Sequence, residues 1–293
     1  MLAQQFADKV AEETGGQVKV QVFANSSLVK STEQYDAMMQ GAVDMSVFPL
    51  DYASGRVPEW SITLMPAMVR NHEEAQAWQD AEIGKRLAEN MEENGVKVLT
   101  WVWNAGAIGA KGDPIVTPDD IRPGMTMRAA GSYVERMLES AGAGISSLPS
   151  NEIYTAMQTG VLDAAVTSTG SFGSYNLQEQ VDSYTSPSEG NTFWFMFEPL
   201  IISTSSFDKL CSEQQDAVVK VGEELQEFAY TASEEDDTRV EKLFADAGVE
   251  VVKMDDAAFE QWRELAQEQW TAYAESVEGG QELLDLAKEV SGQ

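Results

Sequence analysis

The order of hydrophobic and polar positions along the chain predicts alternating helices and strands. Apolar residues recur with helical spacing in five segments, at 2–14, 72–94, 132–140, 257–276 and 280–290. Alternating or continuous apolar residues predict strands in six segments, at 18–23, 43–48, 96–103, 125–129, 193–203 and 249–253. Strands that alternate with helices throughout are typical of the α/β class.

A sixth helix is predicted to be unusually long. Ser212-Glu-Gln-Gln215 has the spacing of a capping box, and no stop signal follows until Gly248. The helix would then continue to about Ala247, far beyond the usual length of about three turns. We expect such a rod to support more than one domain.

One stretch of the chain occurs twice. Residues 33–47 and 152–166 share Glu, Tyr, Ala, Met, Gly, Asp and Val at 7 of 15 positions. Each copy predicts a short helix with Tyr and Met on one face, a glycine stop (Gly41 or Gly160) and a short apolar strand. Helix and strand make half of an α/β unit, so the repeat predicts two domains of similar construction. A cleft between them is where we expect function.

Length and composition agree with two folded domains and exclude one class of partner. The chain has 293 residues, of which 43% are hydrophobic, enough for each domain to bury its own core. Its net charge is −30, from 19 basic and 49 acidic residues, whereas nucleic-acid binding needs a basic surface. The acidic run 233–237 is interpreted as a solvated helix face, because it lacks the residue spacing of a calcium loop.

Cysteine and histidine are too scarce for most metal sites. Cys211 is the only cysteine, which excludes an internal disulfide and a cysteine metal cluster. His72 is the only histidine, and it lies in a polar helix start where we expect it at the surface. We therefore expect neither a metal nor a cofactor. No run approaches the roughly 20 apolar residues of a membrane span, and no signal peptide is present in the sequence.

Motifs for catalysis are also missing from the sequence. There is no nucleophile elbow, phosphate-binding loop, dinucleotide fingerprint or zinc-protease motif. Carboxylates are plentiful, but none lies in a recognisable pair. We predict a protein that is not an enzyme, and an enzyme that uses two carboxylates across the cleft remains the alternative.

Candidate ligand-binding residues come from one arginine and from the aromatic residues. Arg128 ends a short strand beside 129–131, which are small residues. An arginine there either pairs with a structural carboxylate or offers its planar fork to the carboxylate of a ligand. Trp103, Phe172 and the run 193–197 are interpreted either as core or as a pocket wall. In that run alternate residues face opposite ways, so we expect at most one set to line a pocket, either Trp194 and Met196 or the three phenylalanines.

Several motifs occur together in one order along the chain. They are Leu64-x-Pro66, Pro118-Asp-Asp-Ile-Arg-Pro-Gly124, Met127-Arg128, Glu152-x-Tyr154-x-Ala156-x-Gln158-Thr159-Gly160-x-x-Asp163 and Phe207-Asp-Lys-Leu210. On these motifs the chain resembles the DctP-type solute-binding proteins of tripartite ATP-independent periplasmic (TRAP) transporters.

The resemblance implies a two-lobed periplasmic binding protein fold with a long helix bridging the lobes. The expected division is 1–117 plus about 204–248 for the first lobe and 118–203 plus about 249–293 for the second. It further implies a periplasmic receptor that delivers a small solute to a TRAP membrane permease without catalysis. In the family, an arginine that matches Arg128 grips the carboxylate of the ligand. A binding protein of an ABC transporter is the alternative within the same fold.

Three departures from the family pattern bear on the ligand. No arginine occurs between Arg86 and Arg122, where many members carry a second one that faces the ligand. Many members also have Gly-Gln-Glu-Asn after the aspartate that matches Asp163, so here Thr167 would take the place of the asparagine. The first strand of the family is missing, and we expect a truncated start.

Fewer charged groups and more aromatic surface favour a small organic acid or a zwitterion over a highly anionic sugar acid. A small amine is the alternative ligand, because Trp and Phe faces attract cations and Glu198 could neutralise one. In that case Arg128 would hold a structural carboxylate instead.

Overall fold

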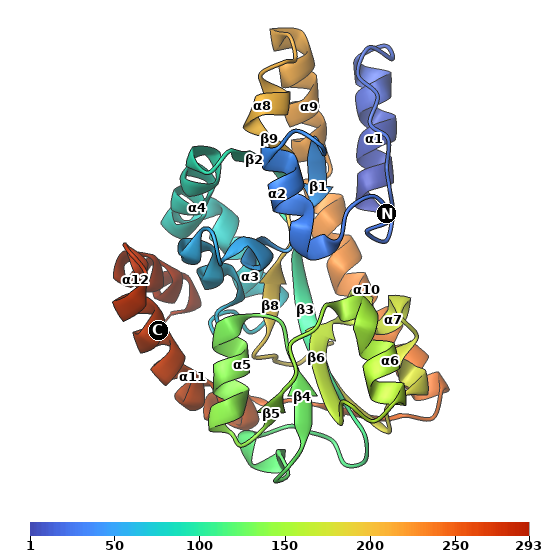
Figure 1. Cartoon of the computed structure of the whole chain (residues 1–293), viewed down its shortest axis with the longest axis vertical. Coiled ribbons are helices and arrows are strands. Elements are labelled where there is room, and N and C mark those ends of the chain that lie inside the picture. The colour runs from blue at the N-terminus through green and yellow to red at the C-terminus, as the bar shows by residue number, and fades with distance from the viewer. Residues whose placement is uncertain (293) are drawn as a thin grey trace.

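The computed structural model describes residues 1–292 and contains two β-sheets, one in each half of an elongated molecule (Figure 1). The smaller sheet has the order β1-β9-β2, with all neighbours antiparallel. Its strands are β1 (Met45–Val47), β9 (Leu200–Ser203) and β2 (Val96–Thr100). Helices cover both faces of this sheet.

The larger sheet is mixed and has seven strands. Its order is β10-β7-β3-β6-β4-β5, and β8 pairs with the first half of β3. The strands are β3 (Trp103–Ala110), β4 (Thr126–Arg128), β5 (Gly144–Ile145), β6 (Ala164–Ser168), β7 (Ser183–Ser186), β8 (Phe195–Phe197) and β10 (Glu250–Lys253). Since β4 and β6 are parallel neighbours, their carboxyl ends meet at one edge.

Alternate side chains of β9 point to opposite faces of the smaller sheet, and a different layer of helices covers each face. Leu200 and Ile202 pack with α1 (Leu2–Glu13) and α9 (Ser212–Glu224), whereas Ile201 faces α2 (Gln34–Met39) and α4 (Glu82–Glu93). The remaining helices of this half are α3 (His72–Asp80) and α8 (Thr204–Phe207).

The larger sheet is covered in the same way. One face packs on α5 (Ser132–Ser140) and α11 (Asp256–Ser276). The other face packs on α6 (Ile153–Gln158), α7 (Thr169–Ser174) and α10 (Gln226–Asp246). The last helix, α12 (Gly280–Ser291), leaves α11 and packs on α3 and α4. Helices on both faces of each sheet confirm the predicted α/β class.

The predicted long helix is present, and it is bent. Only Leu225, which has helical angles of φ −89° and ψ −1°, separates α9 from α10. The hydroxyl of Thr100 donates to Gly222 O at 3.0 Å, the carbonyl that the amide of Gln226 would use in a straight helix. The helix thus passes from the smaller sheet to the larger one (Figure 1).

The chain also passes between the sheets at two short crossings. Residues 101–102 link β2 to β3, and residues 198–199 link β8 to β9. The amide of Glu198 donates to Val102 O at 2.8 Å and joins the two crossings. The continuous strands predicted at 96–103 and 193–203 were therefore wrong: each is two strands in different sheets. Pro199 has no amide hydrogen for a sheet ladder, which explains one of the breaks.

The crossings also exchange strands between the expected lobes. Strand β3 lies within 1–117 yet belongs to the larger sheet, and β9 lies within 118–203 yet belongs to the smaller one. Each of the segments 1–117 and 118–203 thus contains one strand that belongs to the sheet of the other half of the molecule.

Two further expectations about local structure were wrong. The segment 18–23 forms no strand, because it has no hydrogen-bonded partner strand within residues 1–292; Val18 and Val20 instead pack on the α1–α9 layer. The helix expected at 72–94 is broken at Ala81, which is extended at ψ 170°. Gly84 follows the break, and a Cβ there would lie 2.1 Å from Trp78 O, so the two helices meet at a very close approach.

Candidate functional site

A cavity of about 150 Å³ lies between the two sheets. Gln34, Pro49 and Tyr52 line it from the segments around the smaller sheet, and Arg128 and Thr167 line it from the larger sheet. The walls come from both halves of the molecule, so a rotation of one half against the other would open or close it.

Arg128 is held at the end of β4 and is only 1% exposed. Its Nε donates to Leu148 O and its Nη1 to Val166 O, both at 2.9 Å. No ion pair of Arg128 is present among residues 1–292, so the structural carboxylate considered from the sequence has no counterpart there. Burial lowers the pKa of the guanidinium, with Tyr52 acting in the opposite direction. Arg128 is therefore a rigid cation at the cavity wall with no ion-pair partner among the described residues, while the more distant charge of Glu135 also raises its pKa.

Tyr52 lies close to both charged groups of the cavity. It belongs to the 3₁₀ turn Leu50–Ala53, which follows Pro49. Burial raises the pKa of its phenol, the charge of Arg128 lowers it, and the charge of Glu198 raises it. A tyrosine in this position can donate to an anionic ligand or accept from a cationic one.

Glu198 lines the cavity from the crossing between β8 and β9 and is half-buried. Its Oε2 accepts from Nδ2 of Asn104 at 2.8 Å. In the part of the chain that the structure describes, no cation pairs with this carboxyl. Burial raises its pKa to about 7.

Thr167 belongs to a polar wall where β6 meets α7. Thr167 and Ser168 end β6, and Ser171 lies in the first turn of α7. The hydroxyl of Ser168 accepts from the amide of Ser171 at 3.3 Å and caps the helix. All three residues line the cavity, so several hydroxyl groups lie in its wall together with Arg128.

Trp194 supplies an apolar wall and is held in place. Its Nε1 donates to Ala130 O at 3.1 Å, and its carbonyl accepts from the amide of Gly106 at 2.8 Å. Gly106 lies against the indole: a Cβ there would be 2.4 Å from the ring. Met196 lies beside Trp194 in the cavity wall. Of the two alternating sets in 193–197, the structure thus brings Trp194 and Met196 to the cavity.

Trp103 and Phe172 lie outside the cavity lining. Trp103 packs against Trp78 and Phe197, with ring centroids 5.2 Å and 5.0 Å away. Phe172 is fully buried between β3 and α10, 5.2 Å from Tyr184. The side chains of both point into the helix layers, where the sheet faces need apolar cover.

Cavity residues that sequence reasoning missed lie just before the two copies of the repeat. Ser31 and Ser150 occupy equivalent positions, each at the start of the 3₁₀ turn that precedes a repeat helix. Both line the cavity, one from each half of the molecule, and Asn151 lies beside Ser150. The exact spacing of the two repeats was the signal that could have located them.

His72 and Asp237 also lie differently from what we expected. The side chain of His72 is only 17% exposed, and its Nε2 lies 2.7 Å from Oδ2 of Asp237. Asp237 is 3% exposed and accepts a second hydrogen bond from the hydroxyl of Thr169 at 2.6 Å. The interpretation of His72 as a surface residue was wrong, and so was that of Asp237 as part of a solvated face. Helix α10 packs this end of the run against α3 and α7.

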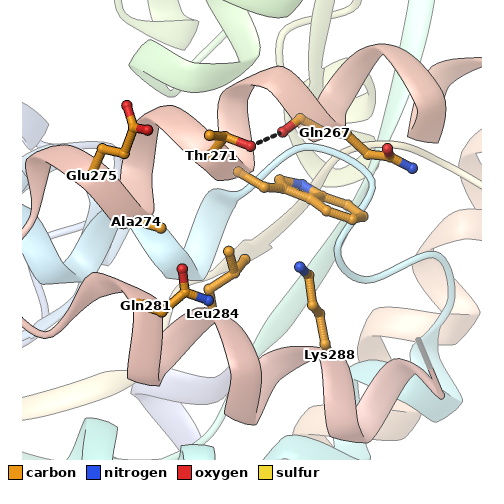
Figure 2. Close-up of a pocket in the computed structure, with 8 residues that line it drawn as sticks. Gln267, Thr271, Ala274, Glu275, Gln281, Leu284 and Lys288 are labelled. Atoms are coloured by element: carbon orange, nitrogen blue, oxygen red, sulfur yellow. Dashed lines mark hydrogen bonds between the residues drawn. The ribbon is translucent and has the colours of Figure 1, made fainter.

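A larger hollow of about 470 Å³ lies between α11 and α12 (Figure 2). Gln267, Thr271 and Glu275 face it from one helix, and Gln281 and Lys288 from the other. Its Lys288 lies 5.4 Å from the Trp270 ring centroid. Both walls belong to neighbouring helices at one end of the chain. The smaller cavity, where charged and polar groups converge from both halves, is therefore the candidate ligand site.

Other kinds of site have no support in residues 1–292. No three side chains of His, Cys, Asp or Glu converge there to hold a metal ion. None of the helices described is long and apolar enough to cross a membrane.

Comparison with known proteins agrees with this geometry. Residues 2–276 match the family of bacterial extracellular solute-binding proteins, family 7 (DctP). A solute-binding protein of Albidiferax ferrireducens is 40% identical over 289 residues, which cover 98% of this chain and 85% of that protein.

Two crystal structures show the same fold with a ligand bound. A TRAP periplasmic solute-binding protein of Rhodoferax ferrireducens, with bound malonate, is 39% identical and has a TM-score of 0.95 over 99% of this chain and 92% of that chain. A TRAP protein of Sulfitobacter sp. NAS-14.1, with bound β-D-galacturonate, is 26% identical and has a TM-score of 0.87 over 98% and 94%.

Proposed function

Because the chain belongs to family 7 of the bacterial extracellular solute-binding proteins, we propose that it binds a small organic carboxylate between its two sheets and delivers it to a TRAP permease. The site of action would be the periplasm. The family is one of receptors, and we propose binding without chemical conversion of the solute.

The observation that carries this proposal is the state of Arg128. A guanidinium that is 1% exposed and makes no ion pair among the described residues has lost its hydration without gaining a directly paired carboxylate. Its two bonds to carbonyls fix the plane of the fork and leave further N–H groups for an anion. A ligand carboxylate can supply both the charge and the acceptors.

The remaining cavity residues fit a small solute with a polar end and a less polar middle. Thr167, Ser171 and Ser150 offer hydroxyl groups near Arg128, and Trp194 offers an apolar face. The cavity of about 150 Å³ has room for a small solute.

Movement of the two halves would couple binding to delivery. Solute enters when the halves are apart, and its contacts with both sets of walls then favour the closed arrangement. A ligand shifts such an equilibrium only by its difference in affinity for the two states. The closed arrangement would present the surface that a permease recognises.

Calorimetry with acetate, propionate and malonate tests the proposal. Wild-type protein should bind at least one of the three, whereas Arg128→Gln and Arg128→Lys should bind none measurably, since lysine lacks the fork. Arg122→Gln is the matched control, because Arg122 is an exposed arginine that bonds only near the surface. Binding that survives in Arg128→Gln would remove Arg128 as the anchor. Circular dichroism of each variant confirms that the loss is not due to unfolding.

Two further measurements address delivery and catalysis. Uptake of the bound acid into vesicles that contain a TRAP permease should require the receptor on the outside. The acid recovered after prolonged incubation should be chemically unchanged, and its conversion would favour the enzyme that uses two carboxylates.

A further inference from the structure

The cavity has a second charged end, formed by Glu198. Its carboxyl lines the same cavity as Arg128, but the two make no ion pair with each other. The two groups enter the cavity from different elements, Arg128 from the end of β4 and Glu198 from the crossing between β8 and β9. Tyr52 lines the same cavity from the 3₁₀ turn Leu50–Ala53. A solute that reaches from one end to the other meets a cation at one side and a carboxyl at the other.

Few groups of the protein face Glu198. Asn104 of β3 donates one hydrogen bond to Oε2, and the hydroxyls of Tyr52 and Tyr175 and the Arg128 guanidinium are the other titratable groups that line the cavity. None of these is a cation within ion-pairing distance. The Glu198 carboxyl is partly removed from water and open to the cavity, but it has no cation to pair with. Like Arg128, it lacks an ion-pair partner that a ligand could supply.

We propose that the solute is a small zwitterion, with its carboxylate on Arg128 and an ammonium group on Glu198. This rests on the function proposed above and specifies the class of solute. A zwitterion completes both ends of the cavity at once and brings no net charge into it. A plain monocarboxylate leaves Glu198 without a partner, and a dianion places its second carboxylate against Glu198.

The titration of Glu198 gives the two kinds of solute opposite pH dependence. Burial raises the pKa of Glu198 to about 7, so below that pH the carboxyl is mostly protonated in the empty site. An ammonium group binds the ionised form, so affinity for a zwitterion should rise towards pH 7 and then level off. A second carboxylate needs the protonated form as a hydrogen-bond donor, so affinity for a dianion should fall above pH 7.

Three probes of similar length separate these cases: β-alanine, propionate and malonate. Wild-type protein should bind β-alanine at least about tenfold more tightly than propionate at pH 7.5. In Glu198→Gln this advantage of β-alanine over propionate should disappear, because glutamine keeps the shape of the side chain and loses its charge. Glu89→Gln is the matched control, since Glu89 is exposed on α4 and should leave all three affinities unchanged.

The outcomes are distinguishable from failure of the receptor itself. If malonate binds more tightly than β-alanine and its affinity falls above pH 7, Glu198 serves as a proton donor to a second carboxylate and the zwitterion is excluded. If propionate and malonate bind through Arg128 but β-alanine binds no better than propionate in wild type, this inference fails while the proposed function stands. If none of the three binds, the carboxylate function itself fails.

Discussion

Nε2 of His72 lies 2.7 Å from Oδ2 of Asp237, although 165 residues separate the two along the chain. The contact joins the start of α3 to the middle of α10, and the hydroxyl of Thr169 adds the start of α7. One buried carboxylate thus connects three helices, two of which cover the larger sheet.

Removal of this carboxylate should destabilise the protein. Asp237→Ala leaves His72 and Thr169 without their shared acceptor, and we expect a loss of about 2–4 kcal/mol in the free energy of unfolding. Urea denaturation measures it. Asp246→Ala, on the same helix but exposed and paired only with Lys242, should change stability by less than about 0.5 kcal/mol. Equal effects of the two substitutions would contradict a structural role for Asp237.

The buried carboxyl of Asp51 should make stability depend on pH. Burial, with a smaller contribution from Glu135, raises its pKa to about 7 from the ordinary 3.8. The folded state therefore holds this proton more tightly than the unfolded state. The stability that this bound proton adds to the folded state is fully present below about pH 4. It is lost as the pH rises through 7, a change on the order of 4 kcal/mol in the free energy of unfolding.

Comparison with Asp51→Asn isolates that contribution, because the other carboxylates are common to both proteins. The difference in unfolding free energy, wild type minus variant, should become less favourable to wild type from about pH 5 to about pH 8. A difference that stays constant over this range would show that Asp51 titrates normally.

A methyl group on Gly106 should damage the cavity wall. Its Cβ would lie 2.4 Å from the Trp194 ring, so the indole must move. We expect Gly106→Ala to cost roughly 1–3 kcal/mol of stability and to weaken solute binding. Gly55→Ala is the control, because nothing lies within 4 Å of a Cβ at Gly55, and it should be neutral or slightly stabilising. Unaltered binding by Gly106→Ala would mean that the position of Trp194 is unimportant.

Phe172 and Trp194 should respond differently to substitution. Phe172→Leu removes part of a ring packed against Tyr184 and Phe244, and we expect a loss of roughly 1–2 kcal/mol in stability with unchanged solute affinity. Trp194→Phe removes the bond to Ala130 O and part of the cavity wall, so affinity should fall. Calorimetry and thermal denaturation of both variants make the comparison, and a large affinity loss in Phe172→Leu would return that residue to the site.

Local sequence signals were sufficient to predict helices and turns that are determined by the residues within them. The helix predicted at 132–140 coincides with α5, and the one at 257–276 differs from α11 by one residue. The repeat predicted a helix, a glycine stop and a strand in each half, and both are present in the structure. Spacing, caps and glycines act within one turn, so they are readable in sequence.

Features that depend on distant partners were not predicted. The apolar run 193–203 is interrupted at Glu198 because β8 pairs in the larger sheet and β9 in the smaller one. The periodicity of the sequence does not show which sheet a strand will join. The burial of Asp237 depends on a histidine 165 residues away. Segment 18–23 has strand composition but no partner strand among the described residues, and a strand forms only as part of a sheet.

The hydrogen bond from the Glu198 amide to Val102 O has a consequence for the timing of binding. It joins two of the places where the chain passes between the sheets, so any rotation of one half against the other turns about a line close to it. Atoms near a pivot travel least. The Glu198 end of the cavity should therefore already have its final shape before closure, while Gln34 and Arg128 approach each other only as the halves meet. Substitutions at Glu198 would then chiefly slow the capture of solute, and substitutions at Gln34 would chiefly hasten its escape.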